Sequence, residues 1–344
     1  MKIRNLAWLL ILVLIGCSSD DDEAPAPAPS AGAHLIIGNQ GGFMATNASI
    51  TVFNYENGEI SQNVYAEANN DEVIGDVLQS MDLFNNELYV VMNNSSKIEV
   101  LDPTTFVSKR VIQGFTSPRY IEFLSADKAY VSDLASSSIH IINPTTGTYT
   151  GTINTGFWVE EMVAVNGQIW CTAPSENKVI VVDPSTDSVV DEMALTANAN
   201  DILIDTNSDV WVLCQGSYSE PFVEPTLYRI DPATSQIEAT FTYPPGTGFG
   251  GNIEISATGQ ELYLLVQGDV SKMNIAATEL PSQTYISIDG GSCYGMAVDT
   301  DSGDIFLSNA GDFVQDGVSY VYNSNGELEK VIESGIIPWA AVWN

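Results

Sequence analysis

The strongest constraint on this chain is a sequence repeat with a period of about forty residues. Each copy contains short runs of alternating or continuous apolar residues, which is the pattern of β-strands. Aromatic residues mark the second run in six copies, at spacings of 41, 40, 41, 52 and 43 residues: Tyr89, Tyr130, Trp170, Trp211, Tyr263 and Phe306. Four-strand units at this period are typical of a β-propeller.

A turn sequence after the third run repeats as well. It reads Asp-Pro-Thr-Thr at 102–105, and close variants occur at 143–146, 183–186 and 231–234. The Asp or Asn side chain accepts a backbone N–H, and the proline presets φ for a type I turn. Degenerate copies at Asn54, Asn274 and Asn323 bring the total to seven, which predicts seven four-stranded blades.

The two ends of the repeat region complement each other. The first copy begins at residues 34–37, which align with a second strand, so this copy lacks an inner strand. The chain ends in Pro338–Trp343, which aligns with the inner strand that begins at Pro118. We therefore predict an all-β, seven-bladed β-propeller over residues 34–344, closed by a C-terminal strand that completes the first blade.

The first 33 residues have the features of a bacterial lipoprotein leader. Lys2 and Arg4 precede an apolar stretch at 6–15, which is too short to span a membrane, and Cys17 follows in a lipobox-like context. We expect residues 1–16 to be a signal peptide and Cys17 to be lipidated; an ordinary signal peptide is the alternative. Residues 17–33 then comprise this cysteine, an acidic run and an Ala/Pro tether.

Charge and cysteine content exclude several classes of function. The 44 acidic and 11 basic side chains give a formal charge of -33, which argues against nucleic acid or an anionic lipid surface as a partner. Membrane contact is expected through the lipid anchor only. Cys171, Cys214 and Cys293 lie in or beside apolar runs without metal-ligand spacing, so we expect buried free thiols and no cofactor.

A ligand would bind at the channel mouth where the inner strands begin. One position per blade forms a predicted mouth ring: Gln79, Arg119, Glu161, Asn200, Gly251, Tyr294 and Trp339. Aromatic residues occur in the surrounding loops: Phe43, Trp158, Tyr218, Phe222, Phe249 and Phe313. Long loops at 215–226 and 309–317 lie on the same face. Such a surface suits a flat or ring-shaped organic ligand, although a solvated rim with aromatic loop anchors explains the same residues.

Catalytic chemistry has weaker support in the sequence. His34 and His140 are the only histidines, and neither is expected at the mouth, so a Ser-His-Asp triad is not predicted. Residues 299–304 resemble part of a calcium loop but are interpreted as a hairpin turn. A calcium site at Glu160, Glu161 or Asp201 remains an alternative. Arg119 could bind an anionic ligand group or pair with Glu161.

The repeat also resembles a known family. Residues 177–190 (NKVIVVDPSTDSVV) look like the YVTN-type repeat, and residues 34–344 resemble YncE-like seven-bladed propellers. The acidic run at 18–23 resembles the export tag of Bacteroidetes surface lipoproteins, and an acidic spacer is the alternative. The combination is similar to BtuG-type lipoproteins.

The resemblance implies a function at the cell surface. It points to a non-enzymatic, outward-facing receptor of the outer membrane that captures a small organic nutrient, with cobalamin as the leading candidate, and passes it to a TonB-dependent transporter. Two alternatives stay open at this stage. One is a calcium-dependent lactonase or hydrolase, and the other is a protein-docking platform without a small ligand.

Overall fold

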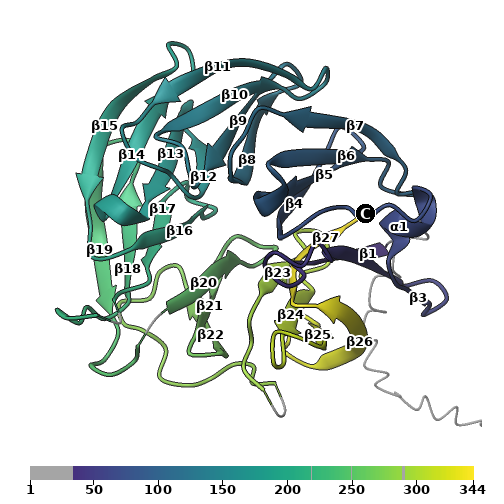
Figure 1. Cartoon of the computed structure of the whole chain (residues 1–344). Helices are drawn as coiled ribbons and strands as arrows, with labels where there is room; N and C mark the ends of the chain where they lie inside the picture. The colour runs from purple at the N-terminus through teal and green to yellow at the C-terminus, as the bar shows by residue number, and fades with distance from the viewer. Residues whose placement is uncertain (1–33, 218, 249, 289–290) are drawn as a thin grey trace, which may run out of the picture.

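The computed structural model describes residues 34–344, apart from 218, 249 and 289–290. Seven antiparallel sheets are arranged in a ring around a central channel (Figure 1). The lipidation, signal and tether predictions for residues 1–33 lie outside the described residues. No helix in the part that the structure describes has the length and apolar character needed to cross a membrane.

Each blade is one sheet, and its inner strand is given first here. Blade one is β27 (Pro338–Trp343), β1 (His34–Asn39), β2 (Ser49–Asn54) and β3 (Ile60–Ser61). Blade two is β4 (Leu78–Phe84), β5 (Glu87–Met92), β6 (Lys97–Leu101) and β7 (Ser108–Gln113). Blade three is β8 (Pro118–Ser125), β9 (Lys128–Asp133), β10 (Ser138–Asn143) and β11 (Thr148–Asn154).

The remaining blades follow in chain order. Blade four is β12 (Met162–Val165), β13 (Gln168–Ala173), β14 (Lys178–Asp183) and β15 (Ser188–Ala194). Blade five is β16 (Ala199–Ile204), β17 (Val210–Cys214), β18 (Thr226–Asp231) and β19 (Gln236–Thr242). Blade six is β20 (Gly250–Ile255), β21 (Glu261–Val266) and β22 (Asp269–Asn274). Blade seven is β23 (Met296–Val298), β24 (Ile305–Asn309), β25 (Asp316–Tyr322) and β26 (Leu328–Ile336).

The helical elements are short. The α-helix α1 (Val64–Ala68) connects blade one to blade two. Two single turns of 3-10 helix, η1 (Asn93–Ser95) and η2 (Pro174–Glu176), join the second and third strands of blades two and four. The scaffold is therefore built from strands, as the repeat predicts.

The ring closes as the sequence predicts. Strand β27 pairs antiparallel with β1, with Leu35 opposite Trp343 and Ile37 opposite Ala341. The backbone N–H of His34 also donates to the carbonyl of Asn344 at 2.7 Å. Pairing the last strand with the first ties the two ends of the propeller together and leaves no open blade at the junction.

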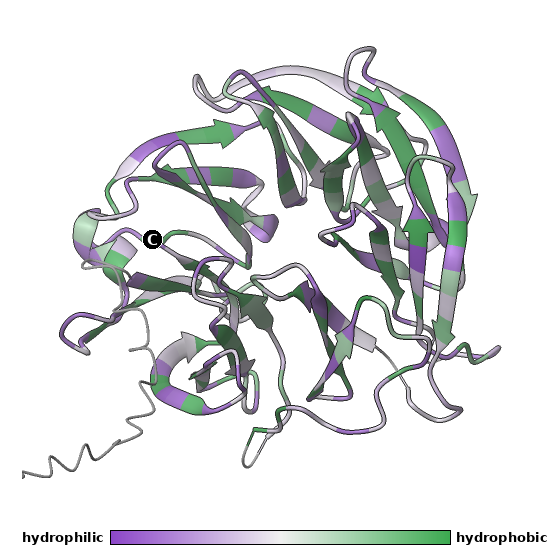
Figure 2. Ribbon diagram, turned by 180° about the vertical axis from the view of Figure 1, so that it is seen from behind, coloured by the Kyte–Doolittle hydropathy of each residue, from purple (hydrophilic) through white to green (hydrophobic). Residues whose placement is uncertain are grey.

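The core lies between neighbouring blades. All six of the predicted marker aromatics are buried, and each contacts apolar residues of the next blade; Trp170, for example, packs with Val210 and Val212. Phe306 of blade seven packs with Leu35 and Ile37 of blade one. Figure 2 shows the corresponding hydrophobic colour along the strands of the blades. The repeated aromatic residue thus packs between neighbouring sheets and fills the space between them.

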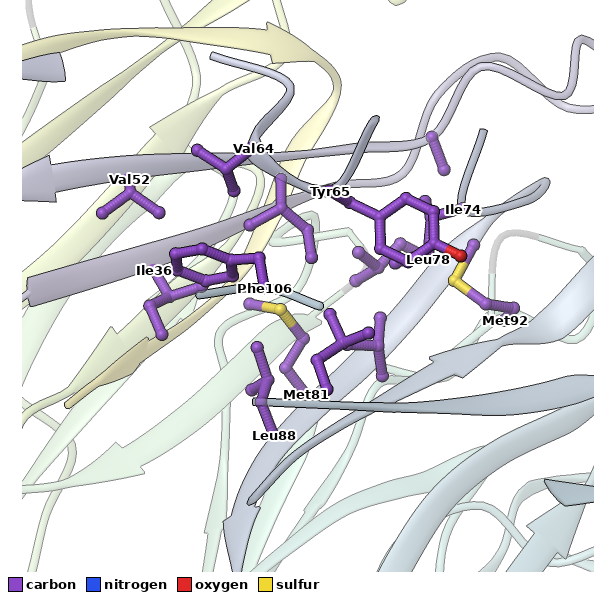
Figure 3. Close-up of a cluster of buried hydrophobic side chains, with 14 residues drawn as sticks. Ile36, Val52, Val64, Tyr65, Ile74, Leu78, Met81, Leu88, Met92 and Phe106 are labelled. Atoms are coloured by element: carbon purple, nitrogen blue, oxygen red, sulfur yellow. The ribbon is translucent and has the colours of Figure 1, made fainter. Parts of the chain in front are cut away.

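The contact between blades one and two has an additional layer. Val64 and Tyr65 of α1 join Phe106 over Ile36 and Leu88, which come from the facing sheets (Figure 3). This helix therefore covers apolar surface that the two-residue strand β3 leaves open.

The predicted turns form with the expected hydrogen bonds. The backbone N–H groups of Thr104 and Thr105 donate to Asp102 Oδ1 at 3.1 and 2.9 Å.

The prediction of four strands in every blade is wrong for blade six, which has three strands in the described ranges. After β22 the chain contributes only an isolated bridge, between Val270 and Ile286. Asn274 lacks the following proline of the complete turn sequence.

Candidate functional site

The mouth of the channel is located by strand register. In blade three, Pro118 at the start of the inner strand lies opposite Asp133 at the end of the second strand. The loops between second and third strands therefore surround the end of the channel where the inner strands begin. This arrangement agrees with the predicted position of the mouth ring.

Arg119 pairs with Glu160, and the alternative that it pairs with Glu161 is wrong. Its Nε donates to both carboxylate oxygens of Glu160 at 3.0 Å, and Nη2 donates to Oε1 of the same carboxylate. Nη1 donates to Gln79 Oε1, and Gln79 Nε2 donates to the hydroxyl of Tyr120 at 3.2 Å. Arg119, the single basic residue of the mouth ring, therefore connects blades two, three and four through its hydrogen bonds.

Similar contacts connect the following blades. Glu161 Oε2 accepts the backbone N–H of Ile202 at 3.2 Å, and Asp201 Oδ2 accepts that of Ile253 at 2.9 Å. Asn200 donates to Asp201 Oδ1 at 2.8 Å. The two carboxyls thus fasten blade four to five and blade five to six through backbone amides.

Contacts of the same kind connect blades six and seven and blades one and two. Asn252 Nδ2 donates to the carbonyl of Met296 at 3.3 Å, and Trp339 Nε1 donates to the carbonyl of Gln79 at 2.8 Å. The rings of Tyr294 and Trp339 are 5.1 Å apart. We call this circle of contacts around the mouth the polar belt. Most of the predicted mouth ring is part of it.

An aromatic group stands at one sector of the mouth, on blades seven and one. Tyr294 contacts Trp339 and also meets Phe313 edge-on, with ring centroids 5.1 Å apart. Its hydroxyl donates to Gln40 Oε1 at 3.3 Å. Three predicted site residues, from three separate segments of the chain, therefore meet in space. We call Tyr294, Phe313 and Trp339 the aromatic sector.

Exposed apolar side chains border the aromatic sector. Phe43 and Met44, in the loop between β1 and β2, are 69% and 77% exposed. Phe313 and Val314, in the loop between β24 and β25, are 50% and 72% exposed. Large apolar side chains on adjacent mouth loops mark a surface suited to contact with another molecule.

The other predicted residues lie apart from the aromatic sector. Trp158 is half-buried before β12, and Phe222 is 64% exposed in the long loop of blade five. Gly251 has a packing role, since a Cβ atom there would lie 2.4 Å from the carbonyl oxygen of Leu265. Tyr218 and Phe249 lie outside the described residues.

The channel contains a cavity of about 280 Å³ that reaches below the mouth. Sequence reasoning missed three of its lining carboxyls, those of Asp82, Glu122 and Glu254. Each lies three residues after a position of the mouth ring. This regular spacing, with an acidic residue between two apolar residues in each strand, was the signal that could have identified them.

Burial shifts the titration of these groups. It raises the pKa of Asp82 to about 7 and that of Glu254 to about 8, the latter with a smaller contribution from Asp201. Burial and the neighbouring Asp82 raise the pKa of Glu122 to about 7. Burial likewise raises the pKa of Asp201 to about 7, and that of Glu161 well above its ordinary range.

Among the described residues, no histidine or cysteine lines the channel cavity. Within the described residues, no group of three or more His, Cys, Asp or Glu side chains is arranged to hold a metal ion. His140 lies in β10, where it contacts the Asp133 carboxylate at 3.2 Å and the Tyr149 hydroxyl at 3.0 Å. Cys171, Cys214 and Cys293 are buried free thiols, as predicted.

Comparison with known proteins adds the family. Residues 32–336 match the family described as a domain of unknown function, DUF5074. The chain belongs to this family. No curated protein matches the sequence.

Solved structures support the propeller fold. A quinoprotein alcohol dehydrogenase-like protein from Bacteroides thetaiotaomicron is similar with a TM-score of 0.71 and 13% identity, over 91% of this chain and 78% of that one. Hydrazine synthase from Kuenenia stuttgartiensis is similar with a TM-score of 0.63 and 10% identity, over 76% of this chain and 88% of that one. At these identities the likeness concerns the fold alone.

Proposed function

We propose that this DUF5074 protein is a non-enzymatic binding protein that captures a small organic ligand at the mouth of its propeller. The observation that carries the proposal is the aromatic sector, where Tyr294, Phe313 and Trp339 meet beside the channel. Aromatic faces next to polar groups suit a ligand with a flat or ring-shaped apolar part and a polar edge.

The surrounding groups supply both kinds of contact. Phe43, Met44 and Val314 offer exposed apolar area on the two bordering loops. Gln79 and Asn252 line the cavity beneath and carry amide groups. The apolar side chains of the loops would thus cover the ligand at the mouth. The ring of strands would hold the polar groups in fixed positions beneath it.

The ligand candidate and the cellular setting come from the sequence resemblance. We propose that residues 1–16 direct export, that lipidation at Cys17 anchors the protein to the outer membrane facing outward, and that the ligand passes to a TonB-dependent transporter. Cobalamin is the leading ligand candidate, because the lipobox, acidic run and YVTN-type repeat together resemble BtuG-type lipoproteins.

The proposal is tested by retention of cyanocobalamin. The purified protein is mixed with the ligand and desalted, and the visible spectrum of the protein fraction is recorded. Stoichiometric retention is expected, with at least a tenfold weaker affinity for Phe313→Ala. Phe222→Ala is the matched control, because it removes an exposed phenylalanine from a mouth loop outside the aromatic sector.

Each outcome has a defined meaning. A colourless wild-type fraction rejects cobalamin as the ligand. Retention that is equal in wild type, Phe313→Ala and Phe222→Ala rejects the aromatic sector as its site. A loss that is larger for Phe222→Ala than for Phe313→Ala would move the site to the long loop of blade five.

A further inference from the structure

Three carboxyls occupy equivalent positions in three blades. Asp82, Glu122 and Glu254 lie in inner strands, each directly opposite its blade's buried aromatic residue, which is Tyr89, Tyr130 or Tyr263. The equivalent positions of the other four blades hold apolar residues: Val163, Leu203, Ala297 and Val342. We call the three acidic side chains the carboxyl tier. All three line the channel cavity.

The carboxyl tier is not neutralised by the protein. None of the ion pairs between described residues includes Asp82, Glu122 or Glu254. Asp82 and Glu254 also accept no hydrogen bond in the described ranges, whereas Glu122 accepts one from the backbone of Ala164. The three side chains are half-buried in the channel, where carboxyls without a counter-charge are costly, and a bound cation would offset that cost.

The basic residue of the mouth ring, Arg119, is already engaged. Arg119 holds Glu160 with its Nε and Nη2 atoms and Gln79 with Nη1, so its guanidinium serves the polar belt. Glu161 adds a fourth carboxyl to the cavity lining. The cavity therefore has an excess of acidic groups over basic ones, and its own side chains do not supply the counter-charge.

The spacing of the carboxyls favours an extended cation over a metal ion. No metal-binding group of three acidic, His or Cys residues exists among the described residues, so these carboxyls do not converge on one point. Partly exposed apolar residues also contribute to the cavity lining, among them Ala297, Ala340 and Ala341. Tyr120 and Trp339 also line the cavity, and aromatic rings of this kind attract ammonium groups.

We propose that the channel cavity binds a linear aliphatic polyamine, with its ammonium groups at the carboxyl tier and its methylene groups against the apolar part of the cavity lining. A volume of about 280 Å³ fits a ligand at the small end of the range for organic molecules. This site goes beyond the proposed function, because its charged groups lie below the mouth and outside the aromatic sector.

The test is calorimetric titration of the purified protein with spermidine at pH 8. Saturable binding to one site is expected for the wild type. The Asp82→Asn/Glu254→Gln double variant should bind at least tenfold more weakly. Because this protein is strongly acidic, the matched control is Glu279→Gln/Glu329→Gln, which removes two exposed carboxylates outside the channel and should leave the affinity unchanged.

Several results would overturn the polyamine site. Absence of saturable heat rejects it, and equal weakening in the two double variants shows that spermidine binds as a diffuse surface counter-ion. The channel double variant replaces unpartnered carboxyls by amides of the same shape, so a thermal midpoint at least equal to that of wild type verifies its folding. Phe313→Ala should not change spermidine affinity, which separates failure of this site from failure of the mouth site.

Discussion

The polar belt and the carboxyl tier belong to the same inner strands, yet their polar groups are satisfied in opposite ways. At the belt, Glu160 receives a guanidinium, and Asp201 receives the backbone N–H of Ile253 across a blade boundary. At the tier, Asp82 and Glu254 find neither a base nor a hydrogen-bond donor within the described residues. The comparison indicates that the belt's side chains stabilise the ring, whereas those of the tier remain available for another molecule.

The largest expected effect comes from breaking the belt. Arg119→Met leaves the buried carboxylate of Glu160 without its counter-charge, which should lower the free energy of unfolding by about 3–5 kcal/mol at pH 8. Denaturant unfolding measures the change. Glu192→Gln, which removes an exposed partner of Lys178, should cost about 1 kcal/mol or less. A loss below about 1 kcal/mol for Arg119→Met would mean that the belt does not stabilise the ring.

Substitutions in the carboxyl tier should stabilise the protein at pH 8, whereas Arg119→Met in the belt should destabilise it. The pKa values of Asp82, Glu122 and Glu254 are raised by burial to about 7, 7 and 8, so the folded state binds protons that the unfolded chain releases near pH 4. Stability from these groups is present at low pH and is lost as pH rises from about 4 through 8. Of the neighbouring titratable groups, Asp201 and Glu161 interact with Glu254, and the Cys171 thiol and Asp82 interact with Glu122.

This difference is measurable by denaturant unfolding at pH 5.5 and pH 8. The Asp82→Asn/Glu254→Gln variant should be more stable than wild type at pH 8 by about 2 kcal/mol and should show a smaller change between the two pH values. A pH dependence identical to that of wild type would show that the two carboxyls titrate normally.

A single hydrogen bond of the belt tests its blade-to-blade continuity. Trp339→Phe keeps an aromatic ring beside Tyr294 but removes the indole N–H that donates to the carbonyl of Gln79. The expected loss in unfolding free energy is about 1 kcal/mol. An unchanged value would indicate that blades one and two are held by their apolar contacts alone.

The sequence predicts the scaffold well because its signals are local and repeated. The strand pattern, the marker aromatics and the Asp-Pro turns each recur at a fixed spacing, and the shortened first copy requires the C-terminal strand β27. Blade six departs from the prediction because a fourth strand depends on a turn and an edge pairing that the sequence after Asn274 does not specify. Propensity alone does not determine such pairing.

The candidate site was predictable in position but less so in chemistry. Tyr294 and Trp339 of the predicted mouth ring and Phe313 of the predicted loop aromatics lie around one mouth, and the structure shows in addition that their rings are in contact. The prediction of Glu161 as the alternative partner of Arg119 is wrong, because Glu160 and Glu161 are consecutive and the choice between them depends on backbone direction before β12. The mouth-ring prediction also misses the carboxyl tier, since strand alternation does not reveal which side chains line a channel.

The smallest expected effect on stability belongs to the aromatic sector, where binding is the informative measurement. Phe313 is half exposed and its ring meets Tyr294 only edge-on, so Phe313→Ala should lower the unfolding free energy by about 0.5–1 kcal/mol. A larger loss would place Phe313 among the structural residues of the mouth and weaken its assignment as a ligand contact. A small loss in stability combined with a large loss in ligand affinity would separate the binding surface from the belt beneath it, because the belt's contacts do not include the Phe313 side chain.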